Sequence, residues 1–306
     1  MSRQTVEVPD HVERVVTLGA VPVINSFLFA LGEQSVVANG VPPELSRKIH
    51  FVFAPGLAAK PIVQGAEKGL AVETIISLQP DLVLTMDRAT AESLRSLGLP
   101  VAFLQWTAPA DVKAVMKFLG QVFYREQEAL AYQDWFDKMI GDVTRRIDSQ
   151  TASPPRVLYL NLKRLTQPHK IAEWWIPRAG GLSVTDNGRA QESFTFSIEQ
   201  ILAWNPQIII VADMSERQMA FDDPRLKEVA AVRDRRVYVA PAGAHLWANR
   251  TVEQPLTVLW AATIFHPAIF GQRELRAEMA RFYDRFFHIH LNDERIDEIL
   301  AGSSGR

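Results

Sequence analysis

Cysteine is absent from the 306 residues of the sequence. This absence excludes thiol catalysis, zinc sites with cysteine ligands and disulfide bonds. Long apolar runs are also missing: no segment approaches the ~18 uninterrupted apolar residues of a membrane-spanning helix, and the first residues show no signal-peptide pattern. We therefore expect a soluble protein, and a secreted protein without its leader has the same sequence features.

Neither sign of charge is in large excess. The formal net charge is −2, with 22% charged and 47% apolar residues, which is typical of a globular protein and gives no reason to expect a nucleic-acid partner. A chain of 306 residues is long for one hydrophobic core and sufficient for two domains.

The common enzyme motifs are missing as well. There is no Gly-x-x-x-x-Gly-Lys-Ser/Thr, no Gly-x-Gly-x-x-Gly after a strand, no Gly-x-Ser-x-Gly and no His-Glu-x-x-His. Among the seven histidines only His288 and His290 are close in sequence, so the ligand spacing of a zinc enzyme is absent. We predict a protein that is not an enzyme and has no intrinsic cofactor.

Two stretches about 126 positions apart, 72–87 and 198–213, align without a gap and share Glu, Ile, Pro and the final Asp. Each has the pattern of an amphipathic helix that ends before a proline, at Gln79 or Asn205, and leads into an apolar strand. Continuously apolar strands are typical of parallel sheets covered on both faces. The sequence therefore predicts an α/β fold with two lobes and mainly parallel sheets.

The lobes are predicted at 1–108 and 153–306, with a connecting helical segment at 109–152. Within that segment, 125–148 forms the longest helical pattern, in which apolar residues recur every three or four positions at Ala129, Tyr132, Phe136, Ile140, Val143 and Ile147. Elsewhere we expect a strand at 35–38, a mainly irregular stretch at 39–68 with a short helix at 44–50, and helices at 223–230 and 272–287.

Large cationic or polar residues follow the predicted strands. They are Arg88, Trp106, Lys163, Arg164, His245, Trp247 and Arg250. Arginine suits bidentate recognition of carboxylate, catecholate or oxyanion groups, although an arginine in such a loop also caps helices or pairs with acids. We predict that Arg88, Arg164 and Arg250 face one cleft with Trp106 and Trp247. We expect no direct metal site, with His245 as the candidate for a hydrogen bond to the ligand or, alternatively, for metal ligation.

Several segments, in the same order along the chain, resemble the iron-siderophore and cobalamin class of ABC-importer substrate-binding proteins (class III periplasmic binding proteins). They include Trp-Ile-Pro-Arg-Ala-Gly-Gly at 175–181, and the stretches 14–18, 231–238, 259–262 and 266–267. The resemblance implies two Rossmann-like lobes joined by one long rigid helix, with the ligand between them. It also implies that Glu73 and Glu199 meet arginines of the permease, whereas alone each is an ordinary acid near a helix start.

The resemblance predicts an extracytoplasmic solute-binding protein, a monomer that delivers a metal chelate to an ABC permease dimer. Cationic loops favour an anionic iron(III) siderophore as the cargo. Nickel or cobalt chelates, a molybdate-type oxyanion, haem and a corrinoid remain alternatives, as does, more distantly, a two-lobed chelatase-like enzyme. We expect a location in the periplasm or on the outer face of the cell membrane, with the leader or lipoprotein signal absent from this sequence. Asp87 and Asp213 are expected to be structural or rim residues.

Overall fold

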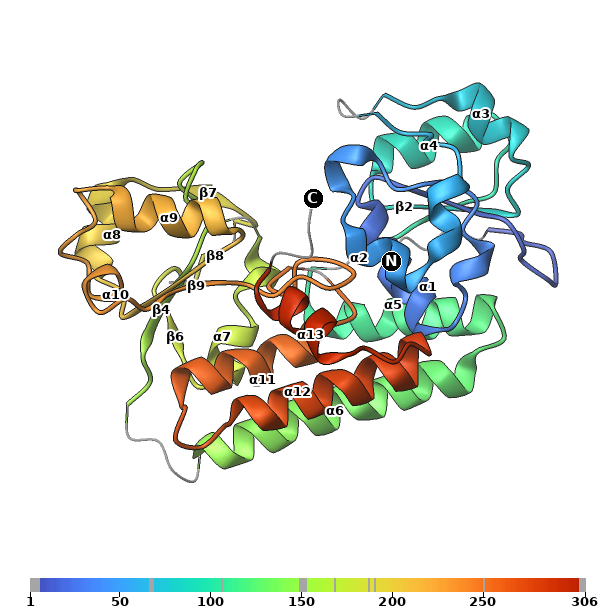
Figure 1. Ribbon diagram of the computed structural model, residues 1–306. Helices are drawn as coiled ribbons and strands as arrows, with labels where there is room; N and C mark the ends of the chain where they lie inside the picture. The colour runs from blue at the N-terminus through green and yellow to red at the C-terminus, as the bar shows by residue number, and fades with distance from the viewer. Residues whose placement is uncertain are drawn as a thin grey trace. The chain divides into compact units, whose positions relative to one another are not determined.

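The computed structural model describes residues 6–65, 69–105, 107–148, 153–167, 169–186, 188–189, 191–249 and 251–302. These residues form two compact units, each an α/β lobe (Figure 1). The N-terminal unit comprises 6–133 and 283–290, and the C-terminal unit comprises 134–282 and 291–302.

The N-terminal unit contains β1 (Val15–Leu18), β2 (Leu82–Thr85), β3 (Val101–Phe103), α1 (Val21–Ala30), α2 (Lys48–Phe53), α3 (Val72–Ser77), α4 (Arg88–Ser96) and α5 (Pro109–Val122). Its single-turn helices are η1 (Gln34–Val36), η2 (Pro43–Leu45), η3 (Pro55–Ala59) and the π-helical turn η5 (Tyr283–Phe287). Helix α6 (Glu126–Asp148) begins in this unit and continues into the next.

The C-terminal unit contains β4 (Arg156–Tyr159), β5 (Thr166–Gln167), β6 (Leu182–Ser183), β7 (Phe194–Thr195), β8 (Ile208–Val211) and β9 (Val237–Val239). Its helices are η4 (Lys170–Ala172), α7 (Trp175–Arg178), α8 (Ile198–Trp204), α9 (Met214–Asp222), α10 (Ala230–Arg233), α11 (Gln254–Phe265), α12 (Gln272–Phe282) and α13 (Asp293–Leu300).

Parallel sheets form the centre of both units, as predicted. In the N-terminal unit the strand order is β1-β2-β3, and Val37 adds a single parallel bridge to Val15 on the free side of β1. In the C-terminal unit the order is β6-β4-β8-β9, again all parallel. The bridge at Val37 occupies the place that β6 holds in the second sheet, so the two sheets share one topology.

The repeat detected in the sequence has the same structure in both units. Ile75 of α3 and Ile201 of α8 are both fully buried against their sheets. Gln79 and Asn205 end the two helices with positive φ angles of 45° and 38°. A backbone turn of this kind allows the chain to reverse directly into the next strand.

An arginine at the start of the neighbouring strand ties each turn to its sheet. Arg14 Nε donates to the carbonyl oxygen of Gln79 at 2.8 Å, and Arg156 Nη2 donates to that of Trp204 at 2.6 Å. The repeat therefore includes β1 and β4 as well as the aligned helix-strand stretches.

Helix α6 confirms the predicted long helix. It covers Glu126–Asp148, and its buried side chains recur every three or four residues. The predicted apolar positions are buried except Ile140, which is half-buried, while its neighbour Met139 is buried instead.

Near its C-terminal end, the chain returns to the N-terminal unit. The predicted lobe at 153–306 did not include this return. Tyr283 and Phe287 of η5 pack on Phe53, with ring centroids 5.3 and 5.0 Å apart, and Phe287 also contacts Phe29. These ring contacts group 283–290 with the first unit. Helix α12 ends at Phe282, where the π-helical turn begins.

Three smaller predictions differ from the structure. In place of the strand expected at 35–38, the structure has the 3₁₀ turn η1 followed by a single β-bridge at Val37. The helix expected at 44–50 is divided into η2 and α2. The helix expected at 223–230 lies earlier, as α9, because Asp213 caps it, and residues 224–228 form turns.

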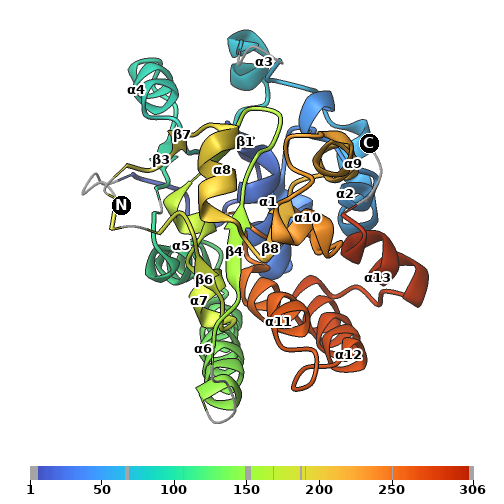
Figure 2. The same ribbon diagram turned by 90° about the vertical axis from the view of Figure 1, so that its left-hand side faces the viewer.

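The second face of the C-terminal sheet is covered by aromatic packing. Trp175 of α7 is fully buried and contacts the rings of Tyr159, Trp260 and Phe265. Helices α11 and α12 lie side by side in both views (Figures 1 and 2). Within the described ranges, no helix combines the length and apolar character needed to cross a membrane.

Candidate functional site

The carboxyl ends of the strands define the candidate ligand edge of each unit, because ligands of open α/β sheets bind there. Two acids follow strands at this edge, and each caps the next helix. Asp87 Oδ1 accepts from the backbone N–H of Thr90 at 2.8 Å, and Asp213 Oδ1 accepts from that of Glu216 at 2.9 Å. Their structural role agrees with the prediction.

A buried polar cluster lies at the carboxyl end of β1. Asn39 accepts from the backbone N–H of Thr17 at 2.8 Å and donates to the carbonyl of Thr17 at 3.0 Å. Gln64 likewise accepts from the N–H of Gly19 at 2.6 Å and donates to its carbonyl at 3.2 Å. Thr17 Oγ1 donates to Asn25 of α1 at 2.9 Å. These contacts fix the turn from β1 into α1.

Helix α1 starts at this edge, and no side chain caps its first turn or offsets the positive end of its dipole. Gly19 turns the chain with a φ of 80°, the helix has no side-chain cap, and no acid occupies its first turn. By contrast, α4 at the same edge is capped by Asp87. Pro22 in the first turn has no N–H, and the N–H groups of Val23 and Ile24 donate to the carbonyl oxygen of Ala20 at 2.9 and 3.1 Å. The positive end of the helix dipole therefore favours an anion in front of α1 more than free donors do.

Arg88 supplies a cation to the edge of the N-terminal unit. It is the exposed first residue of α4, and its guanidinium carbon lies 4.8 Å from the ring centroid of Phe103, at the end of the neighbouring strand. Stacking on an aromatic face restricts the guanidinium while leaving its edge N–H groups available for an anion.

In the C-terminal unit, the loop after β4 carries two cations. Lys163 Nζ lies 3.0 Å from Asp213 Oδ2, so its charge is already paired. Arg164 is exposed, and its backbone N–H donates to Asn161 Oδ1 at 2.9 Å, which fixes the loop. Arg164 is therefore the better candidate for an anionic ligand.

The carboxylates beside this loop have shifted pKa values of opposite sign. Partial burial opposes ionisation of Asp213, but hydrogen bonds from Ser215, the Glu216 backbone and Lys163 outweigh it and lower its pKa to about 2. Burial raises the pKa of Glu216, which accepts from the backbone N–H groups of Ala212 and Lys163. Asp213 therefore stays charged and keeps Lys163 neutralised.

The loop that carries His245 is organised by Glu253. This carboxylate is fully buried and accepts from the backbone N–H groups of Ala244 at 2.9 Å and His245 at 3.2 Å, and from Thr251 Oγ1 at 2.9 Å. His245 is half-buried, so its contact with a ligand stays a prediction.

Trp247 lies inside the C-terminal unit, with 0% of its surface exposed. Its position corresponds to packing in the core, and a ligand could touch it only after a local rearrangement. The sequence pattern could not reveal this because loop tryptophans line both cores and clefts. Trp106 and Arg250 lie outside the described residues, and the convergence of the predicted set on one cleft stays a prediction.

The two acids predicted to dock the permease are exposed. Glu73 and Glu199 occupy the first turns of α3 and α8. Hydrogen bonds from Ser197 and from the Glu199 backbone N–H lower the pKa of Glu199, which therefore stays charged.

Sequence reasoning missed Thr17, Asn25, Asn39 and Gln64 at the end of β1. A signal was present, because Asn39 and Gln64 lie in the long irregular stretch at 39–68, and such stretches in compact lobes are often functional. Their pairing with β1 depends on contacts distant in sequence, which no local pattern specifies.

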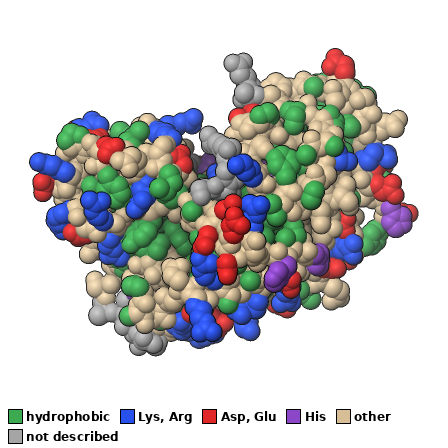
Figure 3. All heavy atoms as spheres, viewed as in Figure 1, with side chains coloured by type: hydrophobic (Ala, Val, Ile, Leu, Met, Phe, Trp, Pro, Cys, Tyr) green, Lys and Arg blue, Asp and Glu red, His purple; other side chains and the backbone are tan. Residues whose placement is uncertain are grey.

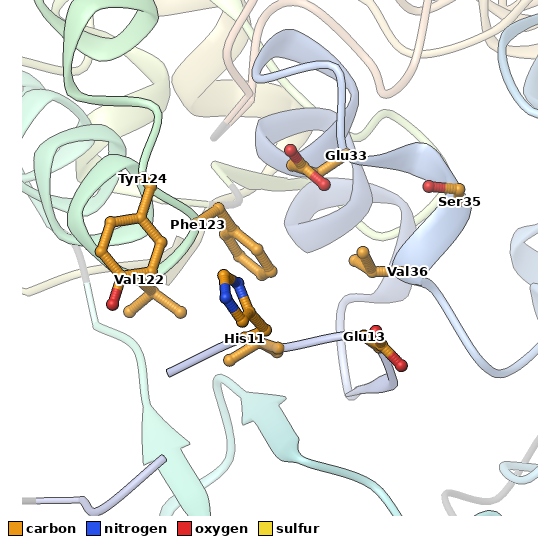
Figure 4. Close-up of a pocket in the computed structure, with 9 residues that line it drawn as sticks. His11, Glu13, Glu33, Ser35, Val36, Val122, Phe123 and Tyr124 are labelled. Atoms are coloured by element: carbon orange, nitrogen blue, oxygen red, sulfur yellow. The ribbon is translucent and has the colours of Figure 1, made fainter. Parts of the chain in front are cut away.

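A pocket of about 360 Å³ lies at the other end of the N-terminal sheet, before β1. Figure 4 shows the rings of His11, Phe123 and Tyr124 next to one another in its wall. Glu33 in the same wall pairs with Arg125 at 2.7 Å. Because this pocket lies at the amino ends of the strands, it is not part of the candidate ligand edge.

The face of the molecule seen in Figure 3 carries charges of both signs. On the face in Figure 3, Lys and Arg are interspersed with Asp and Glu, in agreement with the net charge of −2. In the part of the chain that the structure describes, no group of three or more His, Asp or Glu residues is placed to hold a metal ion.

Comparisons with known proteins identify the family and the fold. Residues 28–244 match the family of periplasmic binding proteins. The chain is 22% identical to the molybdate-binding protein MolA of Haemophilus influenzae over 92% of this chain and 88% of that protein, and the structure of MolA bound to molybdate aligns with a TM-score of 0.80 and 18% identity over 94% of this chain and 97% of that one.

Two further structures have the same fold. A periplasmic solute-binding protein from Veillonella parvula has a TM-score of 0.82 and 23% identity over 97% of this chain and 94% of that one. CeuE of Helicobacter pylori, in a complex with nickel and histidine, has a TM-score of 0.76 and 17% identity over 97% of this chain and 96% of that one.

Proposed function

Because the chain belongs to the periplasmic binding protein family, we propose that it captures an anionic ligand outside the cytoplasm and delivers it to an ABC permease. Members of this family are transport-associated binding proteins, not enzymes, and they carry a transported ligand rather than an intrinsic cofactor. The protein acts as a monomer on a permease dimer.

The ligand is an oxyanion of the molybdate type. The observation that carries this assignment is the uncapped start of α1 at the carboxyl end of β1, with no acid in its first turn. Pro22 removes one N–H from this first turn, so the support comes from the positive end of the helix dipole, which favours a compact anion. Arg88 and Arg164 provide cations at the ligand edges of the two units, and the similarity to molybdate-binding MolA covers 92% of the chain.

An anionic iron(III) siderophore, ranked first from the sequence alone, is the second candidate. The stacked pair of Arg88 and Phe103, 4.8 Å apart, favours it, because catecholate or carboxylate groups bind such a cation. Trp247, one of the aromatic residues expected to contact a large ligand, is buried. We therefore favour the oxyanion over the siderophore.

Calorimetric titration distinguishes these ligands. We expect molybdate to bind with a Kd below about 1 µM, or about −8 kcal/mol, and sulfate, ferric siderophores, nickel–histidine, haemin and cobalamin to bind at least about tenfold more weakly. Submicromolar binding of a ferric siderophore with no heat from molybdate would reverse the order of the two candidates. Binding of none of these ligands would contradict the proposed function.

The docking function rests on Glu73 and Glu199. Both are exposed, and they occupy equivalent positions in the two units. The double variant Glu73→Arg/Glu199→Arg should keep its ligand affinity but lose most transport in proteoliposomes with the cognate permease, because like charges then face each other. A matched control is Glu92→Arg/Glu228→Arg, which reverses two other exposed acids. Normal transport by the first variant would exclude this docking mode.

A further inference from the structure

The two proposed docking acids each have an exposed aliphatic neighbour at the same distance along the helix. Ile76 lies three residues after Glu73, and Leu202 lies three residues after Glu199. Their exposed fractions are 47% and 41%. At 3.6 residues per turn, positions three apart differ by only about 60° around the helix, so each acid and its aliphatic neighbour share one face.

The opposite face of each helix is fixed by the core. Ile75 and Ile201 are fully buried against the sheets of their own units. Because both helices bury this same position of the repeat, Glu73 and Ile76 face solvent in the N-terminal unit in the way that Glu199 and Leu202 do in the C-terminal unit.

Single exposed hydrophobic residues are normal on protein surfaces, so the equivalence of these two is the informative feature. The offset of 126 positions relates β2 to β8 and α4 to α9 as well as the two helices. Across these elements the other exposed large hydrophobic residues are Leu97, Met214 and Met219. Their counterparts are Asp223, Arg88 and Ser93. Only Ile76 and Leu202 are matched by an apolar residue.

We infer that Ile76 and Leu202 are apolar anchors of the permease-docking surface, each covering the ion pair that its neighbouring acid makes with a permease arginine. This inference rests on the proposed docking by Glu73 and Glu199. The partner is a permease surface with an arginine beside an apolar patch at each of two positions. Exclusion of water around the ion pairs strengthens them and reduces their screening by salt.

The test is binding of the full chain to its cognate permease in nanodiscs, measured at low and high salt. We expect Ile76→Ser/Leu202→Ser to raise the Kd at least about tenfold, since two side chains no longer bury apolar surface. We also expect its binding to become more salt-sensitive than that of the unchanged protein. Circular dichroism melting confirms that the variant is folded.

The matched control is Leu97→Ser/Leu182→Ser, which removes one aliphatic side chain of similar exposure from each unit, 53% and 48%, and should bind as the unchanged protein does. A second comparison is Glu73→Gln/Glu199→Gln. If this variant binds weakly while Ile76→Ser/Leu202→Ser binds normally, the anchors are excluded and acid docking stands. If loss of the acids leaves binding unchanged, the proposed docking fails, and the anchors fail with it.

Discussion

Asp87 and Asp213 show how one residue type serves the same local purpose twice. Each follows a strand, and each accepts a hydrogen bond from the backbone N–H three residues later, at the start of α4 or α9. Asp213 additionally pairs with Lys163 and accepts from Ser215. An acid at the ligand edge therefore need not repel an anionic ligand, because helix donors and a lysine already compensate its charge.

The charge of Asp213 makes stability depend on pH. Burial of Asp213 raises its pKa, but hydrogen bonds and Lys163 outweigh this effect and lower the pKa in the folded state to about 2. Ionised Asp213 therefore stabilises the fold above the pKa of aspartate in the unfolded chain, about 3.9. This stabilisation is lost as the pH falls through about 2. The advantage of the unchanged protein over Asp213→Asn in urea unfolding should therefore shrink between pH 5 and pH 2.5.

Asparagine is also a good helix cap, so the Asp213→Asn comparison isolates the charge. Burial, the largest cause of the raised pKa of neighbouring Glu216, shifts stability in the opposite direction and is common to both proteins, whereas the smaller contribution of the Asp213 charge to that pKa is lost in Asp213→Asn. A difference in unfolding free energy that stays constant from pH 5 to pH 2.5 would show that the Asp213 charge does not stabilise the fold.

At the scale of elements, the Gly-Gly pair after α7 is a packing device. Gly180 has a φ of 78°, and a Cβ there would collide with the ring of His266 and lie 2.9 Å from Ile147. His266 Nε2 also lies 3.1 Å from the carbonyl oxygen of Gly180. The backbone of this turn thus fits against α6 and the end of α11 without room for a side chain.

We expect Gly180→Ala to lower the free energy of unfolding by about 1–3 kcal/mol, from backbone strain and overpacking. Gly56→Ala is the matched control, because no atom lies within 4 Å of a Cβ at that position. Denaturant unfolding of both variants measures the difference. Equal stability of Gly180→Ala and the unchanged protein would mean that the turn tolerates a Cβ.

The elements show what sequence patterns can predict. Helix α6 and the helix-strand repeat were predictable because buried positions recur with a helical period and proline marks the helix ends. The strand expected at 35–38 and the helix expected at 223–230 were wrong, since short segments depend on tertiary contacts, such as the bridge at Val37, and on caps, such as Asp213. Boundaries of short elements carry little local signal.

For the whole molecule, the return of 283–290 to the N-terminal unit was not predictable, because Tyr283 and Phe287 find Phe53 more than 200 positions earlier. The same limit applies to the site. Cationic residues after strands were visible in the sequence, while the uncapped start of α1, the Asn39–Gln64 cluster and the burial of Trp247 depend on the folded chain.

The proposed oxyanion ligand of this periplasmic binding protein is expected to bind at the start of α1 and to Arg88. Calorimetric titration with molybdate, on the unchanged protein and on Arg88→Ala, tests this claim most directly. We expect Arg88→Ala to weaken binding at least about tenfold, since a charge-assisted contact is lost. Arg145→Ala, which removes an exposed arginine of α6, should have no effect. Equal molybdate affinity of Arg88→Ala and Arg145→Ala, or no binding of molybdate at all, would contradict the claim.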